Sequence, residues 1–256
     1  LITINGGIAR YAPNGAFQSM LVPAGSGVGS ICLDPSGDYV IAPGAGLYDR
    51  FGNLLPSDWA SLPGPECSVD HSGNVYVGIG PFSTAAQPPP WSATIGKYAL
   101  DGVLVRDYTA AVDASAATFR VTGLDVVPGQ CTLDYVNDGG ALLLRYNICT
   151  GAQEPALTSL TPGICDTLRI RQDGQIVVAC DDAAVLLDAA GSQLRSFQVD
   201  QTSDLRYVAL APPHENGFWL ATYRGLITHY RYSGMQLAQF SVSGSPAGIA
   251  VVGGSS

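Results

Sequence analysis

Basic residues and long apolar runs are scarce in this sequence. Only 12 of its 256 residues are lysine or arginine, Lys97 is the one lysine, and the formal net charge is −9. Proteins that bind nucleic acid or anionic membrane surfaces need clustered basic side chains, so both kinds of partner are disfavoured. No apolar run approaches the roughly 18 residues of a membrane span, and no signal peptide is recognisable. Because the first residue is Leu1 rather than Met, we expect a chain that was processed or excised from a longer one.

The sequence also lacks helical periodicity and the common motifs of nucleophilic and phosphate chemistry. No window of a dozen residues keeps apolar side chains at a spacing of about 3.6 without Gly or Pro, so we expect no helix of any length. No Gly-x-Ser-x-Gly motif occurs, and the glycine-rich segment 25–30 lacks the lysine and the strand-to-helix context of a phosphate loop. His71 and His214 lie in predicted turns and His229 lies in a predicted strand. We interpret the two histidines in turns as surface residues rather than catalytic bases.

A repeated pattern runs through most of the chain. Six times an aromatic residue or leucine is followed by turn-forming or small residues, a glycine and an apolar run, as in Tyr-Ala-Leu-Asp-Gly-Val-Leu-Val at 98–105. Each copy is typical of a tight hairpin, in which glycine supplies the positive φ. The interval between copies is 37 to 50 residues, the range of a four-stranded propeller blade. The glycines of the six copies are Gly15, Gly52, Gly102, Gly151, Gly191 and Gly234.

A second turn motif, Asp-x-x-Gly between apolar strands, alternates with the first and occurs at 34–37 and 70–73. Two hairpin turns in each period imply four strands in each period. The sequence therefore predicts an all-β, six-bladed β-propeller of one domain, with four antiparallel strands per blade. The N- and C-terminal strands are expected to share one blade and so close the ring. The predicted blades occupy residues 29–62, 66–112, 122–160, 164–200 and 205–242, and the sixth combines 245–256 with 1–24.

The positions of the six cysteines favour disulfides. Cys165 and Cys180 stand symmetrically about a predicted turn at 172–173, so the hairpin would place them opposite one another. Cys32 and Cys67 precede their turn glycines by five and six residues, and this offset points them toward each other from neighbouring blades. The three predicted pairs are Cys165–Cys180, Cys32–Cys67 and Cys131–Cys149, the last flanking a turn at 137–140.

Six cysteines allow fifteen connectivities, and buried free thiols remain an alternative to any pairing. None of the cysteines has the Cys-x-x-Cys spacing of a zinc site. If the predicted pairs form, the protein resides in an oxidising compartment, which is extracytoplasmic: periplasmic or secreted.

The alternation of Asp-x-x-Gly with Tyr-x-x-x-Gly resembles the NHL-repeat and senescence-marker/gluconolactonase-like six-bladed propellers. Segments 130–133, 146–150, 168–170 and 177–180 are similar to a set of uncharacterised bacterial secreted propellers. The resemblance covers the whole chain for the fold, and residues 122–240 for the closer set. It implies an architecture rather than an activity, because propellers include lactonases, lyases, sensors and pure interaction modules.

The lactonase branch of this resemblance implies a divalent metal in the central channel, held by Glu, Asp and Asn side chains of the inner strands. Only Glu66, Asp125 and Asp166 supply carboxylates on the expected inner strands, and no Asn is available there. The sequence thus departs from the metal site of that family. The simpler interpretation of these three acids is as solvated channel or turn residues. A metal-dependent hydrolase of the lactonase type is kept as the alternative function.

An insertion at 78–92 in the second blade exceeds what the repeat requires. It carries Phe82, the proline run 88–90 and Trp91, and it should project from the face that bears the blade-to-blade connections. Exposed aromatics on a rigid loop suit recognition, although Trp91 packed against its neighbouring blade is an equal alternative. We therefore expect a non-catalytic, cofactor-free propeller that binds a protein or glycan or serves as a subunit of a larger assembly. The expected companions of the loop on that face are Asp181, Asp182, Tyr223 and Arg224.

Overall fold

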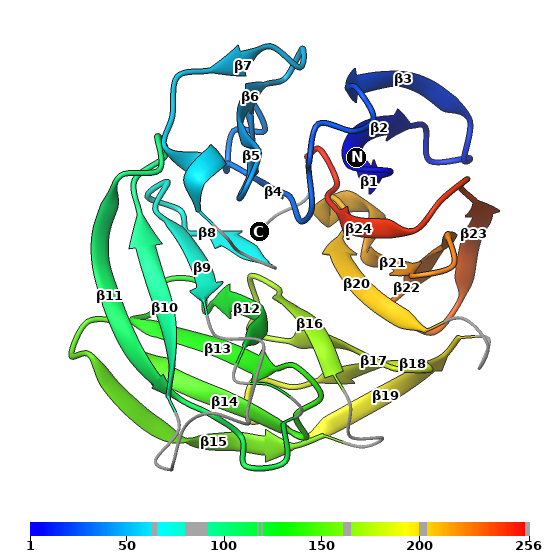
Figure 1. Cartoon of the computed structure of the whole chain (residues 1–256). Helices are drawn as coiled ribbons and strands as arrows, with labels where there is room; N and C mark the ends of the chain where they lie inside the picture. The colour runs from blue at the N-terminus through cyan, green and yellow to red at the C-terminus, as the bar shows by residue number, and fades with distance from the viewer. Residues whose placement is uncertain are drawn as a thin grey trace.

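The computed structural model describes residues 1–62, 66–79, 92–116, 118, 120–160, 165–199 and 204–253. These residues form six four-stranded antiparallel sheets arranged in a ring (Figure 1). The predicted six-bladed β-propeller is therefore confirmed. In the described part of the chain the helical structure is limited to two short 3-10 turns, η1 (Trp59–Ser61) and η2 (Pro213–Glu215). None of these segments has the length and apolarity of a membrane-spanning helix.

Each blade is named here by its sheet, with strands given from the innermost outward. Blade one contains β4 (Cys32–Leu33), β5 (Tyr39–Ala42), β6 (Gly46–Asp49) and β7 (Leu54–Leu55), and blade two contains β8 (Cys67–Val69), β9 (Val75–Ile79), β10 (Ser92–Tyr98) and β11 (Leu104–Ala111). Blade three contains β12 (Val121–Val126), β13 (Thr132–Asn137), β14 (Leu142–Asn147) and β15 (Ala152–Ser159), and blade four contains β16 (Cys165–Ile170), β17 (Ile176–Cys180), β18 (Ala183–Leu187) and β19 (Gln193–Gln198). Blade five contains β20 (Leu205–Leu210), β21 (Gly217–Thr222), β22 (Leu226–Arg231) and β23 (Gln236–Ser241), and blade six contains β24 (Pro246–Ile249), β1 (Ile2–Ile4), β2 (Gly7–Tyr11) and β3 (Phe17–Val22).

Blade six closes the ring as predicted. Its innermost strand, β24, comes from the C-terminal part of the chain and pairs antiparallel with β1 from the N-terminal part, with Ile2 opposite Ile249. Beyond the strands, the backbone N–H of Ala250 donates to the carbonyl of Leu1 at 2.9 Å. Closure in this way pairs β24 with β1, so the C-terminal strand is not left outside a sheet.

The tight turns form because of local side-chain and glycine chemistry. In the turn between β8 and β9, the Asp70 carboxylate accepts backbone N–H bonds from Ser72 and Asn74, both at 2.9 Å, and Gly73 has a φ of +79°. Gly52, in the turn between β6 and β7, has a φ of +89°, and a Cβ there would lie 2.0 Å from the carbonyl oxygen of Leu21. These turns recur around the ring, so the blades repeat their shape.

The hydrophobic core lies between neighbouring blades. Between blades three and four, for example, Leu168 and Ile170 of β16 pack with Val136 and Leu143 of blade three, all at 1% exposure or less. Six clusters of this kind follow the ring. Because alternate strand residues face opposite sides of each sheet, one strand can serve two clusters, as β17 does with Val178 in the cluster between blades three and four and Val177 in the next.

All three predicted disulfides are confirmed. Cys165 and Cys180 lie opposite one another in the ladder between β16 and β17. Cys131–Cys149 forms within blade three, and Cys32–Cys67 joins the inner strands of blades one and two. All six cysteines are thus paired, and their pairing suggests an oxidising environment.

Candidate functional site

The two faces of the ring differ in the connections that they carry. In a four-stranded antiparallel blade the first-to-second and third-to-fourth turns lie at one end, which we call the lower face. The second-to-third turns and the blade-to-blade connections lie at the other end, which we call the upper face. The predicted recognition residues belong to the upper face, because Asp181 and Asp182 connect β17 to β18, and Tyr223 and Arg224 connect β21 to β22. Phe82 and Trp91 lie outside the described residues.

Backbone hydrogen bonds bring the upper-face turns of blades four and five together. The N–H of Leu205 donates to the carbonyl of Asp181 at 2.6 Å, and the N–H of Tyr223 donates to the carbonyl of Asp204 at 2.9 Å. Tyr223 is 54% exposed at this junction. The structure therefore places Asp181 and Tyr223, predicted from separate repeats, on one continuous stretch of surface.

Carboxylates dominate the upper mouth of the channel. Burial raises the pKa of Asp181 against the lowering effect of Arg206, and the Asp204 and Asp182 carboxylates raise it further. Among the described residues neither Asp181 nor Asp182 takes part in an ion pair. We call the five aspartates at this mouth of the channel the acidic rim: Asp138, Asp166, Asp181, Asp182 and Asp204.

Arg206 partly neutralises the acidic rim. Its Nη1 lies 2.7 Å from Oδ2 of Asp166, and its Nε lies 2.8 Å from Oδ1 of Asp204. Burial nevertheless raises the pKa of Asp166 to about 6, because the Asp138 and Asp181 carboxylates add to the effect of burial and Arg206 only opposes it. Arg120 also interacts with Asp138, and Arg224 follows Tyr223, so the five carboxylates of the rim still outnumber these three guanidinium groups.

A second, buried network lies deeper in the channel. The Arg169 guanidinium on β16 forms an ion pair with Glu66, which directly precedes β8 on the other side of blade three. The Asp125 carboxylate on β12 accepts hydrogen bonds from the Ser68 hydroxyl and from the backbone N–H of Ile170, the latter at 2.7 Å. Burial raises the pKa of both Glu66 and Asp125, and Arg169 opposes that rise. The network therefore ties blades two, three and four together through the channel.

The three carboxylates of the alternative metal site are each engaged with protein groups. Glu66 and Asp166 are paired with the guanidinium groups of Arg169 and Arg206, and Asp125 is held by a hydroxyl and backbone N–H groups. A divalent cation would have to share this space with two positive charges. In the described part of the chain no group of three or more His, Cys, Asp or Glu side chains is arranged to hold a metal ion. This donor set does not fit a divalent cation.

Sequence reasoning missed the two arginines that occupy the channel. A signal for Arg169 was present, since a charged residue stands between Leu168 and Ile170 in a buried inner strand. Such a residue in an apolar strand needs a charged partner. The partner itself, Glu66, is 103 positions away and could not be chosen from local pattern.

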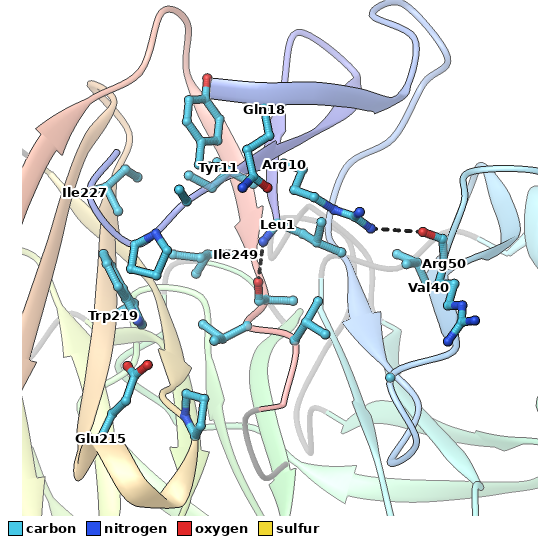
Figure 2. Close-up of a pocket in the computed structure, with 18 of the residues that line it drawn as sticks. Leu1, Arg10, Tyr11, Gln18, Val40, Arg50, Glu215, Trp219, Ile227 and Ile249 are labelled. Carbon is cyan, nitrogen blue, oxygen red and sulfur yellow. Dashed lines mark hydrogen bonds between the residues drawn. The ribbon is translucent and has the colours of Figure 1, made fainter. Parts of the chain in front are cut away.

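The lower face carries a pocket of about 640 Å³ where blades five, six and one meet (Figure 2). Trp219, Ile227 and Ile249 form an apolar wall, Arg10 and Arg50 lie at the opposite side, and Glu215 lies below Trp219 in the view of Figure 2. The sequence did not indicate this pocket, because its lining residues are distributed over residues 1–51 and 212–252.

A buried histidine supports the apolar wall of this pocket. The His229 ring stacks on Trp219 with 4.2 Å between ring centres, and its Nε2 lies 3.7 Å from Oε2 of Glu215. Burial lowers the pKa of His229, although Glu215 opposes the change. His229 is therefore largely neutral at neutral pH and acts here as an aromatic packing residue.

The chain was also compared with known proteins. A scan against protein-family models finds no match, and a search of curated proteins finds none either.

Proposed function

We propose that this chain is a non-catalytic binding propeller that recognises a partner through the upper face, alone or as a subunit of a larger assembly. The observation that carries the proposal is the two carboxylates Asp181 and Asp182, which form no ion pair within the described part of the chain, next to the exposed ring of Tyr223. Arg224 extends the same surface. We further propose that the chain is related to the NHL-repeat and gluconolactonase-like propellers through its repeat pattern.

The chemistry of the acidic rim favours one class of partner. A basic segment of a protein would pair with Asp181 and Asp182 and pack on the face of Tyr223, where a cation gains additional attraction. A glycan would use Tyr223 as a stacking platform and the carboxylates as hydrogen-bond acceptors. The excess negative charge at the rim supports the basic protein segment more strongly, because a neutral glycan would leave that charge uncompensated.

The proposed location is extracytoplasmic, in the periplasm or outside the cell. Its support is the presence of three disulfides, one of which joins two blades. The alternative of a lactonase-type hydrolase gains no support from the channel, since Glu66 and Asp166 are paired with arginines.

Binding by surface variants tests the proposal. Immobilised wild-type protein, Asp181→Asn/Asp182→Asn and Tyr223→Ala would be compared by biolayer interferometry against an oligo-arginine peptide, a Gly-Ser peptide and a panel of neutral oligosaccharides. Asp107→Asn is the matched control, because Asp107 is an exposed aspartate on the outer strand β11.

We expect the double variant to bind the oligo-arginine peptide at least about tenfold more weakly, with the difference shrinking at high salt. Tyr223→Ala should lose binding on the scale of an aromatic hot spot, about 2 kcal/mol. Oligosaccharide binding that depends on Tyr223 but not on the two aspartates would assign a glycan partner instead. Equal binding of every probe by wild type and both upper-face variants would contradict the proposal.

A further inference from the structure

The pocket on the lower face has the features of a small-molecule site. Its volume of about 640 Å³ lies within the range that such sites occupy, and its walls come from three blades. We propose that it binds a small amphipathic organic monoanion, with the apolar body on the wall of Trp219 and Ile249 and the anionic group on Arg10. This site lies on the face opposite to the acidic rim, so the proposal stands independently of the proposed function.

Arg10 provides the place for the anionic group. Its Nη2 donates to the backbone carbonyl of Arg50 at 2.9 Å, which holds the guanidinium at the pocket wall and leaves its other N–H groups for a ligand. Among the described residues no carboxylate pairs with Arg10, although the chain has 21 acidic and 12 basic residues. Arg50 is a weaker candidate, because it already lies 3.3 Å from Asp38 in an exposed ion pair.

The apolar wall is rigid before any ligand binds. Trp219 and Ile249 are each 6% exposed, and Ile227 is fully buried, so it supports the wall without offering surface to a ligand. The indole of Trp219 is fixed between the stacked ring of His229 and the edge of Phe240, whose ring centre lies 6.1 Å away. Binding of a phenyl or alkyl group to a preformed apolar surface of this kind costs little conformational entropy, because the wall side chains are already ordered.

Glu215 limits the charge of the ligand. In Figure 2 its carboxylate lies beside Trp219, on the far side of the pocket from Arg10. A second anionic group at the apolar end of a ligand would therefore approach a carboxylate. The walls thus favour a molecule with one anionic end. They disfavour a dianion, whose second charge would face Glu215, and a cation, which Arg10 would repel.

Isothermal titration calorimetry with three ligands of matched shape tests this assignment. The probes are 3-phenylpropanoate, 3-phenylpropanamide and 3-phenylpropylamine, which share one body and differ in the charge of the head group. 4-(2-Carboxyethyl)benzoate adds a second carboxylate at the far end of the ring, where Glu215 would face it. Wild type should bind 3-phenylpropanoate at least about tenfold more tightly than the amide, and 4-(2-carboxyethyl)benzoate no more tightly than 3-phenylpropanoate.

Two variants of Arg10 and one control complete the experiment. Arg10→Gln should abolish the preference for the acid over the amide, while Arg10→Lys should retain part of it, because lysine keeps the charge and loses the planar pair of donors. Arg195→Gln, which removes an exposed arginine on β19 outside the pocket, should behave as wild type. The urea midpoint of each variant verifies that it is folded.

Three outcomes would overturn the proposal: wild type that binds the amide or the amine as tightly as the acid, Arg10→Gln that keeps the preference, or no binding of any probe by folded wild type. Loss of the preference in Arg195→Gln to the same degree as in Arg10→Gln would also overturn it, since the effect would then not belong to the pocket.

Discussion

Replacement of Arg169 by methionine removes a buried positive charge from the channel. The Arg169 side chain is 10% exposed and that of Glu66 is 4% exposed, so neither charge is screened by bulk water. The variant would leave Glu66 without its guanidinium partner and would remove the favourable interaction of Arg169 with Asp125. Methionine fills much of the same volume, so the main change is electrostatic.

The expected loss follows from the burial of this pair. Breaking a buried ion pair by removal of one partner costs about 3–5 kcal/mol in free energy of unfolding, because an uncompensated charge remains. Burial already raises the pKa of Glu66 with Arg169 present, and without Arg169 it rises further. An acid whose pKa is higher in the folded state than in the unfolded state loses stability as pH rises. The penalty should therefore be larger at about pH 8 than at about pH 5.

Urea unfolding of the oxidised protein, followed by tryptophan fluorescence, measures both quantities. The double variant Glu66→Gln/Arg169→Met should recover most of the loss, since it leaves no unpaired charge at Glu66. Arg50→Met is the matched control: the Arg50 and Asp38 side chains are 61% and 52% exposed, and loss of such a pair costs less than about 1 kcal/mol. An Arg169→Met variant that loses no more than Arg50→Met, or a loss that is the same at both pH values, would refute the reasoning.

Three further predictions concern the rim, a disulfide and the closure of the ring. The pKa of Asp166 is about 6 in the folded protein against an ordinary 3.8, so its contribution to the free energy of unfolding is complete below about pH 4 and is lost as pH rises through 6. Urea titrations of the wild type from pH 4 to 8 should show this decline of about 3 kcal/mol, and Asp166→Asn should flatten it. Cys165→Ala/Cys180→Ala opens a disulfide that spans 15 residues and should cost about 3 kcal/mol in the same assay, and an unchanged urea midpoint would contradict this. Deletion of residues 1–22 removes β1–β3 and exposes β24, so the chain should aggregate or unfold, as size-exclusion chromatography would show. A monomer with an unchanged melting temperature would count against this account of closure.

Most of the fold could be predicted because its determinants are local. Each turn is formed by side chains and glycines within a few residues, as at Asp70 and Gly73, so a repeat of turns in the sequence becomes a repeat of blades. The Cys165–Cys180 bond was predictable for the same reason, since a symmetric hairpin places its two ends opposite one another. Closure followed from counting strands at the two ends of the chain.

The channel and the lower pocket could not be predicted, because their determinants are not local. The ion pair of Glu66 with Arg169 joins residues of blades two and four, and nothing in either repeat specifies the partner in the other. The pocket depends on how three blades meet. His229 illustrates the same limit: its strand was predicted, but its stacking on Trp219 depends on the cross-strand register, which opposes the two residues.

The inner strands of three consecutive blades each contain one extra residue near their upper end. In each of these strands two consecutive paired residues are two positions apart, while their partners on the second strand are only one position apart. The paired residues are Val121 and Gly123, Cys165 and Thr167, and Leu205 and Tyr207. The residues that stand outside the ladder are Thr122, Asp166 and Arg206.

A bulged residue has no directly opposed cross-strand partner, so its side chain can change without shifting the register of the strand. The chemistry of the channel mouth is thereby separated from the pairing that builds each blade. Natural divergence or a combinatorial library at these three positions would change the charge of the channel mouth while the register of the strands stays the same.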